Sequence, residues 1–137
     1  MKKQITTIAY NDEQYDCKYE IHYPKIKSGS MQEIIGIKLW LPNDNEVQYF
    51  DFQLTIINDD TLKVTSIFAG NDRQRKKGIP EALILMSRSL FNKKITSSSR
   101  SNINAEFRNS AATKVWERLV QKDLAKYNVA KDIYELN

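Results

Sequence analysis

Four cations stand in the five positions from Arg73 to Lys77, and Gly78 and Pro80 follow closely. An apolar stripe begins at Ile79 and returns at offsets of three, four, seven and eleven residues, which is the spacing of one helix face. A helix N-terminus presents backbone amides without intrahelical partners and the positive end of the helix dipole. Gly78 permits a positive φ and a close approach of a ligand, because it has no Cβ. This order predicts a site for an anion such as a pyrophosphate.

The residues before this loop alternate between apolar and polar and are interrupted by turn residues, as in an antiparallel meander. We expect five strands there, at 4–10, 15–23, 33–41, 47–57 and 62–69. After the helix at Ile79 we expect a short strand at 94–98, a helix over 112–120 and a final strand at 132–136. Either Asn109 or Ser110 can cap the second helix. The predicted fold class is mixed α/β (α+β): an N-terminal meander followed by β-α-β-α-β, whose first helical crossover makes its flanking strands parallel.

Length and composition predict a single domain over residues 1–137. The net charge of +4 could favour an anionic partner but does not require nucleic acid. The lone Cys17 cannot form an intrachain disulfide, and the single His22 has no second ligand at metal spacing, so we expect a reducing compartment and no metal site. The first ten residues lack the apolar core of a signal peptide, and no run approaches the roughly 20 apolar residues that span a bilayer. We therefore expect a cytoplasmic protein without a membrane partner.

Residues 75–80 (RKKGIP) resemble the Q/R-x-x-G-x-G/A signature of the GNAT superfamily of N-acetyltransferases, which holds the pyrophosphate of acetyl-CoA at a strand-to-helix turn. Residues 64–69 (VTSIFA) are similar to the family's fourth strand, whose backbone hydrogen-bonds the pantetheine arm. Asn109, Ala112 and Trp116 resemble the family's N-x-x-A-x-x-x-Y pattern, in which the asparagine contacts the cofactor. The resemblance covers roughly residues 47–136, and it is most specific between residues 64 and 91.

The resemblance implies a small divergent N-acetyltransferase with a central mixed sheet and a V-shaped opening between its parallel strands. Acetyl-CoA would be the cosubstrate, and an unidentified amine would attack its thioester directly, with backbone amides of the fourth strand polarising the carbonyl. The implied cofactor-binding residues are Phe68, Ala69, Arg75, Lys76, Lys77, Gly78, Ile79, Pro80, Glu81 and Asn109.

Three departures from the family pattern leave a second interpretation open. Pro80 replaces a glycine or alanine and removes one amide, and Trp116 stands where the family has a tyrosine. An indole N–H cannot protonate a leaving thiolate as a phenol can. The family's two helices between its first strands, which help form the acceptor site, are not expected here. We assign no catalytic residue, and a catalytically degenerate module that binds CoA or a protein is the alternative.

A third interpretation comes from the aromatic residues of the meander. Tyr15, Tyr19 and Trp40 lie among lysines in predicted strands, and such interleaving is one way in which sheets bind single-stranded nucleic acid. Aromatic residues are also common in strands for their β-propensity alone, so nucleic acid is not our expected partner. The oligomeric state stays open, and a homodimer is compatible with the sequence.

Overall fold

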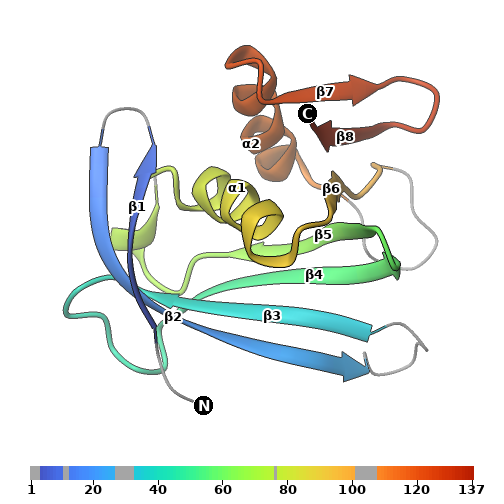
Figure 1. Ribbon diagram of the computed structural model, residues 1–137. Helices are drawn as coiled ribbons and strands as arrows, with labels where there is room; N and C mark the ends of the chain where they lie inside the picture. The colour runs from blue at the N-terminus through green and yellow to red at the C-terminus, as the bar shows by residue number, and fades with distance from the viewer. Residues whose placement is uncertain (1–3, 11–12, 27–32, 76, 101–107) are drawn as a thin grey trace.

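The computed structural model shows a mixed α/β fold built on one sheet (Figure 1). The described residues are 4–10, 13–26, 33–75, 77–100 and 108–137. Within them lie eight strands, in the sheet order β1-β2-β3-β4-β5-β6-β8-β7, and two α-helices. The strands are β1 (Gln4–Tyr10), β2 (Glu13–Ile26), β3 (Glu33–Trp40), β4 (Phe50–Asn58), β5 (Thr61–Phe68), β6 (Lys94–Ser97), β7 (Ala125–Asn128) and β8 (Ile133–Leu136). The helices are α1 (Ile79–Phe91), α2 (Ser110–Gln121) and the short 3-10 helix η1 (Asp72–Gln74).

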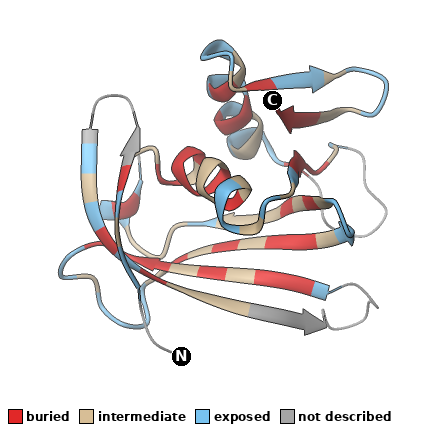
Figure 2. Cartoon of the chain, viewed as in Figure 1, coloured by how far each residue is buried: buried red, intermediate tan, exposed pale blue. Residues whose placement is uncertain are grey.

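The first five strands form the predicted antiparallel meander, each paired with the next along the chain. Successive side chains of a strand point to opposite faces of the sheet, and one face is apolar. On β3 this face carries Ile37 and Leu39, and on β4 it carries Phe52 and Leu54, all 0% exposed. Helix α1 lies across this face, and their side chains belong to one core (Figures 1 and 2). The period-two pattern of the sequence thus identified the strands of the meander.

Helix α1 begins as predicted and connects two parallel strands. Pro80 lies in its first turn, where a missing amide costs no intrahelical hydrogen bond. Ile79 and Leu83 are 0% exposed against the sheet, whereas Leu90, the last residue of the predicted stripe, is 38% exposed in the final turn of the helix. Strand β6 then runs parallel to β5, which confirms the predicted crossover.

Helix α2 and the hairpin of β7 and β8 complete the fold beyond β6 (Figure 1). The hairpin joins the sheet through β8, which pairs antiparallel with β6. The sequence predicts only the strand at 132–136, so the prediction of a single strand after the second helix was wrong. Strand β7 escaped detection because it is an edge strand whose burial is confined to Ala125 and partly Asn128, which leaves no apolar alternation to recognise.

The fourth strand starts at Phe50, three residues later than predicted. The intervening residues form a turn instead of extended strand: the Asp44 carboxylate accepts a hydrogen bond from the Leu41 amide at 2.7 Å, and the Glu46 carbonyl accepts one from Trp40 Nε1 at 3.1 Å. Val47 is 79% exposed as a result. Side-chain hydrogen bonds of this local kind compete with strand pairing.

Candidate functional site

A cavity of about 270 Å³ lies where β5 and β6 separate. The parallel pairing of these strands ends at Val64 and Ser97, whereas β5 continues to Phe68. The second half of β5, the residue after β6, the first turn of α1 and the first half of α2 line the cavity. The cavity therefore adjoins the N-terminus of α1, where the sequence predicts an anion site.

Gly78 is the residue that turns the chain into α1 at this cavity. It has φ 71° and ψ 16°, the left-handed conformation that glycine adopts without a Cβ clash. The first backbone hydrogen bond of the helix runs from the Ala82 amide to the Gly78 carbonyl at 3.0 Å. The amides of Gly78, Ile79 and Glu81 thus precede the hydrogen-bond ladder of the helix, at the positive end of its dipole.

The structure brings six of the ten predicted cofactor-binding residues to this cavity: Ala69, Arg75, Gly78, Pro80, Glu81 and Asn109. Three others lie elsewhere. The Phe68 side chain is 67% exposed, and Ile79 is 0% exposed in the core. The Lys77 ammonium lies over the ring of Tyr15, 5.1 Å from its centroid. Phe68, Lys77 and Ile79 can therefore offer a ligand their backbone groups but not these side chains, and Lys76 lies outside the described residues.

The two arginines of the basic loop differ in whether their side chains are bound within the protein. Arg73 donates to the Pro42 carbonyl at 2.7 Å and to Asp44 Oδ1 at 2.6 Å, so its charge is used within the protein. Arg75 lines the cavity, and among the described residues its exposed side chain forms one ion pair, 3.3 Å long, with the fully exposed Asp72. A pair this exposed contributes little to stability. Arg75 is thus the described residue of the loop whose side chain can meet an anion in the cavity.

Asp44 anchors the residues between β5 and α1 to the β3–β4 connection. Its carboxylate side chain is 0% exposed and accepts hydrogen bonds from the Leu41 amide, Asn71 Nδ2, Gln74 Nε2 and Arg73 at 2.6–3.0 Å. Burial alone would raise the pKa of Asp44, but these donors together lower it below its ordinary value of 3.8. The loop that leads to Gly78 is therefore held by the β3–β4 connection, which lies about 30 residues earlier in the sequence.

Glu81 places a buried carboxylate at the floor of the cavity. Its side chain is 1% exposed, and Oε1 accepts a hydrogen bond from Arg118 Nε of α2 at 2.7 Å. Oε2 is equally buried and has no hydrogen-bond partner among the described residues. The sequence analysis includes Glu81 among the implied cofactor-binding residues but gives its side chain no role. Position 81 is not part of the predicted apolar stripe, so the spacing along the helix did not indicate that this carboxylate is buried.

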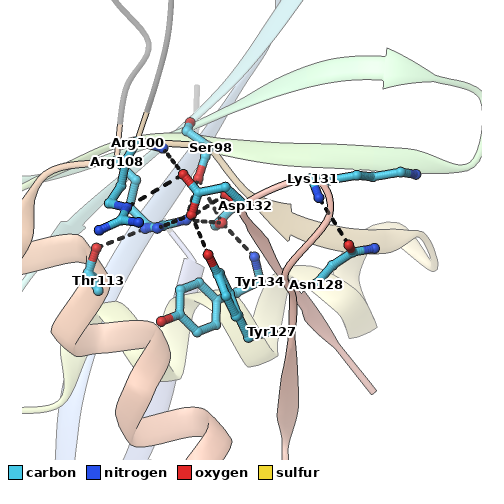
Figure 3. A network of polar contacts seen from close by, with 10 residues as sticks. Ser98, Arg100, Arg108, Thr113, Tyr127, Asn128, Lys131, Asp132 and Tyr134 are labelled. Atoms are coloured by element: carbon cyan, nitrogen blue, oxygen red, sulfur yellow. Dashed lines mark hydrogen bonds and ion pairs between the residues drawn. The ribbon is translucent and has the colours of Figure 1, made fainter.

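Arg108 forms one wall of the cavity, and its guanidinium is 2% exposed (Figure 3). It donates to Thr113 Oγ1 at 2.8 Å, to the Ser98 carbonyl at 3.0 Å, and to both the carbonyl and Oδ1 of Asp132 at 2.9 and 2.8 Å. Tyr127 Oη also donates to Asp132 Oδ1 at 2.7 Å. These donors hold the pKa of Asp132 well below its usual range. Arg108 therefore fixes the β7–β8 hairpin to α2 and contributes positive charge to the wall.

Asn109 and Trp116, two residues of the family-like pattern at α2, have different roles in the structure. Asn109 caps the helix, since its side-chain oxygen accepts a hydrogen bond from the Ala112 amide at 2.8 Å, which confirms the predicted cap. Its side-chain Nδ2 is the group left to donate to a ligand. Trp116 is 1% exposed and stacks on Tyr134, with ring centroids 6.1 Å apart. Trp116 thus both packs in the core, as its place on the apolar stripe predicts, and lines the cavity.

Other residues with reactive side chains lie apart from the cavity. Asp51, Asp59 and Asp60, which the sequence places near the fourth and fifth strands, are not among its lining residues. Burial, and next the charge of Asp16, raise the pKa of the Cys17 thiol to about 11, so this thiol is protonated at neutral pH. In the described ranges, no three or more His, Cys, Asp or Glu side chains gather in a way that could hold a metal ion.

The aromatic residues of the meander are largely packed. Tyr19 and Trp40 are 7% and 6% exposed, and Trp40 meets Tyr49 edge to face at 5.8 Å between centroids. Bases stack on exposed aromatic faces, which these two side chains do not offer.

No described helix has the length and apolar character needed to cross a membrane. A comparison of the sequence with protein-family models and with curated proteins gives no match.

Proposed function

We propose that the chain is an N-acetyltransferase of the GNAT type, which moves an acetyl group from acetyl-CoA to an amine. One observation carries the proposal: the parallel pairing of β5 and β6 stops at Val64 and Ser97, and a cavity opens there against the N-terminus of α1. The V-shaped opening and the pyrophosphate turn of the family would both fall at this place. The left-handed Gly78 at the same turn adds support.

In this proposal the pyrophosphate is bound by the N-terminus of α1. The amides of Gly78, Ile79 and Glu81 precede the helical ladder, and Pro80 removes one donor from the set. Arg75 adds a cation at the same side of the cavity. Backbone amides and a cation of this kind are suited to a diphosphate, because the helix dipole adds about half a positive charge.

The pantetheine arm would lie between β5 and α2. After Val64 the described residues of β6 no longer pair with β5, so peptide groups of β5 face the cavity beside Asn109. A neutral amine would attack the thioester carbonyl and form the C–N bond of a tetrahedral oxyanion, which would collapse as the C–S bond breaks. The nitrogen would release its extra proton to solvent, and the leaving thiolate would take up a proton from solvent. Amides near Phe68 and Ala69 would stabilise the oxyanion. Positioning the two reactants would supply most of the rate enhancement.

Binding of acetyl-CoA is the first test of this proposal. Millimolar acetyl-CoA should raise the melting temperature, since a ligand that binds only the folded state stabilises it. Gly78→Asn should then weaken the affinity measured by calorimetry at least about tenfold, because asparagine adopts the left-handed conformation but adds a side chain where the pyrophosphate would pack. Asn92→Gly, at the left-handed C-terminal cap of α1, is the matched control and should bind like the parent. No thermal shift for the parent would refute the proposal.

A module that binds CoA without transferring the acetyl group is a second candidate. It is favoured by Trp116, which is 1% exposed at the family's tyrosine position and cannot serve as an acid. Among the described residues that line the cavity there is no Tyr, His or Cys. Release of free thiol from acetyl-CoA, followed over a broad panel of amines, separates the two. Turnover with any amine supports the transferase, and cofactor binding without turnover supports the module.

A further inference from the structure

Glu81 Oε2 is a buried acceptor without a hydrogen-bond partner among the described residues, and it belongs to a residue that lines the cavity. The side chain is 1% exposed and lines the cavity, and no described group donates to this oxygen. Leaving a buried acceptor unsatisfied destabilises the folded state, and a charged acceptor does so more than a neutral one. Such atoms are rare in folded proteins, and each calls for a physical explanation. A donor supplied by the bound ligand would satisfy it.

The charges around the cavity restrict what this donor can be. Arg118 already compensates the charge of Glu81 through its hydrogen bond to Oε1 at 2.7 Å. Arg75 and Arg108 also line the cavity, so three arginines face one carboxylate among the described lining residues. Arg108 is paired with Asp132 and Arg118 with Glu81, so Arg75 carries the least compensated charge of the wall and disfavours an ammonium group there. A neutral N–H or O–H group on an otherwise anionic ligand fits the open oxygen better.

We propose that Glu81 Oε2 accepts a hydrogen bond from a neutral donor on the pantetheine arm of a CoA thioester, and so determines how the arm lies against α1. This inference rests on the proposed function. The arm carries two amide N–H groups and a hydroxyl, while the nucleotide end carries the phosphates. The helix N-terminus and Arg75 would thus bind the phosphates, and Glu81 would recognise the arm. Affinity for the whole cofactor would depend on both, whereas affinity for the nucleotide end alone would not depend on Glu81.

The substitution Glu81→Gln inverts the polarity of this position. Arg118 offers an N–H at 2.7 Å, so the glutamine carbonyl oxygen must face Arg118 and its NH₂ group must take the place of Oε2. The cavity then presents a donor in place of an acceptor. Glu81→Leu removes the acceptor without adding a donor, and an apolar side chain suits a position that is 1% exposed.

The test is calorimetric titration of the full chain and its variants with acetyl-CoA and with adenosine 3′,5′-diphosphate, which lacks the arm. Glu81→Gln and Glu81→Leu should each bind acetyl-CoA about tenfold more weakly than the parent, as expected for loss of one hydrogen bond to a charged acceptor. Both should bind the diphosphate within about twofold of the parent. Arg75→Gln is the matched control and should weaken both ligands alike, because both carry phosphates.

Three results would overturn the inference. Acetyl-CoA affinities of both variants within twofold of the parent would show that no donor of the arm reaches Oε2, while leaving the proposed function intact. If the variants lost as much affinity for adenosine 3′,5′-diphosphate as for acetyl-CoA, Glu81 would act through the phosphate site. Failure of the parent to bind acetyl-CoA would reject this inference together with the proposed function. Melting curves of both variants establish that they are folded before they are titrated.

Discussion

The loop that leads into α1 is bound by one buried carboxylate, that of Asp44 in the β3–β4 connection, and a second buried carboxylate, that of Glu81, follows it in the first turn of α1. The Asp44 side chain is 0% exposed and the Glu81 side chain is 1% exposed, and each accepts a hydrogen bond from one arginine. Asp44 receives further donors on both oxygens, from the Leu41 amide, Asn71 and Gln74. Glu81 leaves Oε2 without a partner in the described chain. The hydrogen bonds of the first carboxylate are supplied by the fold, and we propose that a ligand supplies the missing donor of the second.

We therefore expect the two carboxylates to affect different quantities, Asp44 the free energy of unfolding and Glu81 the affinity for a ligand. Changes around Asp44 should lower the free energy of unfolding, because they leave buried donors unsatisfied. Changes at Glu81 should alter ligand affinity and leave the fold nearly as stable as before.

Asp44→Ala should destabilise the protein by about 3 kcal/mol, since it leaves one N–H of the buried Gln74 amide group and the Leu41 N–H without their acceptor. Arg73 is half exposed and can be hydrated, which limits the loss. Urea unfolding followed by circular dichroism measures the effect. A loss under 1 kcal/mol would mean that Asp44 does not anchor the loop.

Gly70→Ala should cost about 2 kcal/mol, because a Cβ there would lie 2.3 Å from the Tyr49 carbonyl oxygen, and backbone must move to relieve the clash. Gly36→Ala is the control, since its Cβ would meet its nearest atom, the His22 carbonyl oxygen, at an ordinary 3.8 Å. The control should keep the parent's stability within about 0.5 kcal/mol. Equal urea midpoints for the two variants would contradict the close packing of Gly70 in this loop.

The stability from Asp44 should be lost in acid. Its pKa is lowered by folding, so the stabilisation is fully present above the unfolded value near 3.8 and disappears as pH falls through the lower folded value. The parent should therefore lose more free energy of unfolding than Asp44→Asn when the pH of the urea titration falls from 6 to 3. Asp132 also has a lowered pKa, so the free energy of unfolding of Asp44→Asn should still fall in part with decreasing pH. Parallel pH profiles would contradict the prediction.

Glu81→Leu should change the free energy of unfolding by less than about 1 kcal/mol, because replacing a buried charge by an apolar group of similar size is often neutral. Its partner Arg118 has a side chain that is 47% exposed and can be hydrated. The measurement is the same urea titration that is used for Asp44→Ala. A loss near 3 kcal/mol would make Glu81 a second structural carboxylate and remove the contrast between the two regions.

Much of the fold follows from local patterns in the sequence. Alternation identified the meander, and the stripe from Ile79 identified α1 and with it the parallel crossover. The position of Gly78 at a loop-to-helix junction indicated its left-handed conformation, because few other residues adopt it without strain. Strand β7 was missed because an edge strand buries little and shows no alternation.

The site was predicted only in part, because its decisive contacts join residues far apart in the chain. Arg73 belongs to the basic run in the sequence, yet it is bound to Asp44, which lies 29 positions earlier. Arg108 reaches Asp132 across 24 positions. The open oxygen of Glu81 depends on how α1 packs against Arg118 of α2. Spacing along the chain indicates which residues share an element face, but not which donors another element brings to them.

The most direct measurement is a crystal structure of the protein with acetyl-CoA. We predict density for the pyrophosphate within hydrogen-bond distance of the Gly78 amide, with the pantetheine arm running between β5 and α2 past Glu81. Density for the cofactor at any other surface, with the cavity between β5 and β6 filled only by water, would contradict the assignment of this cavity.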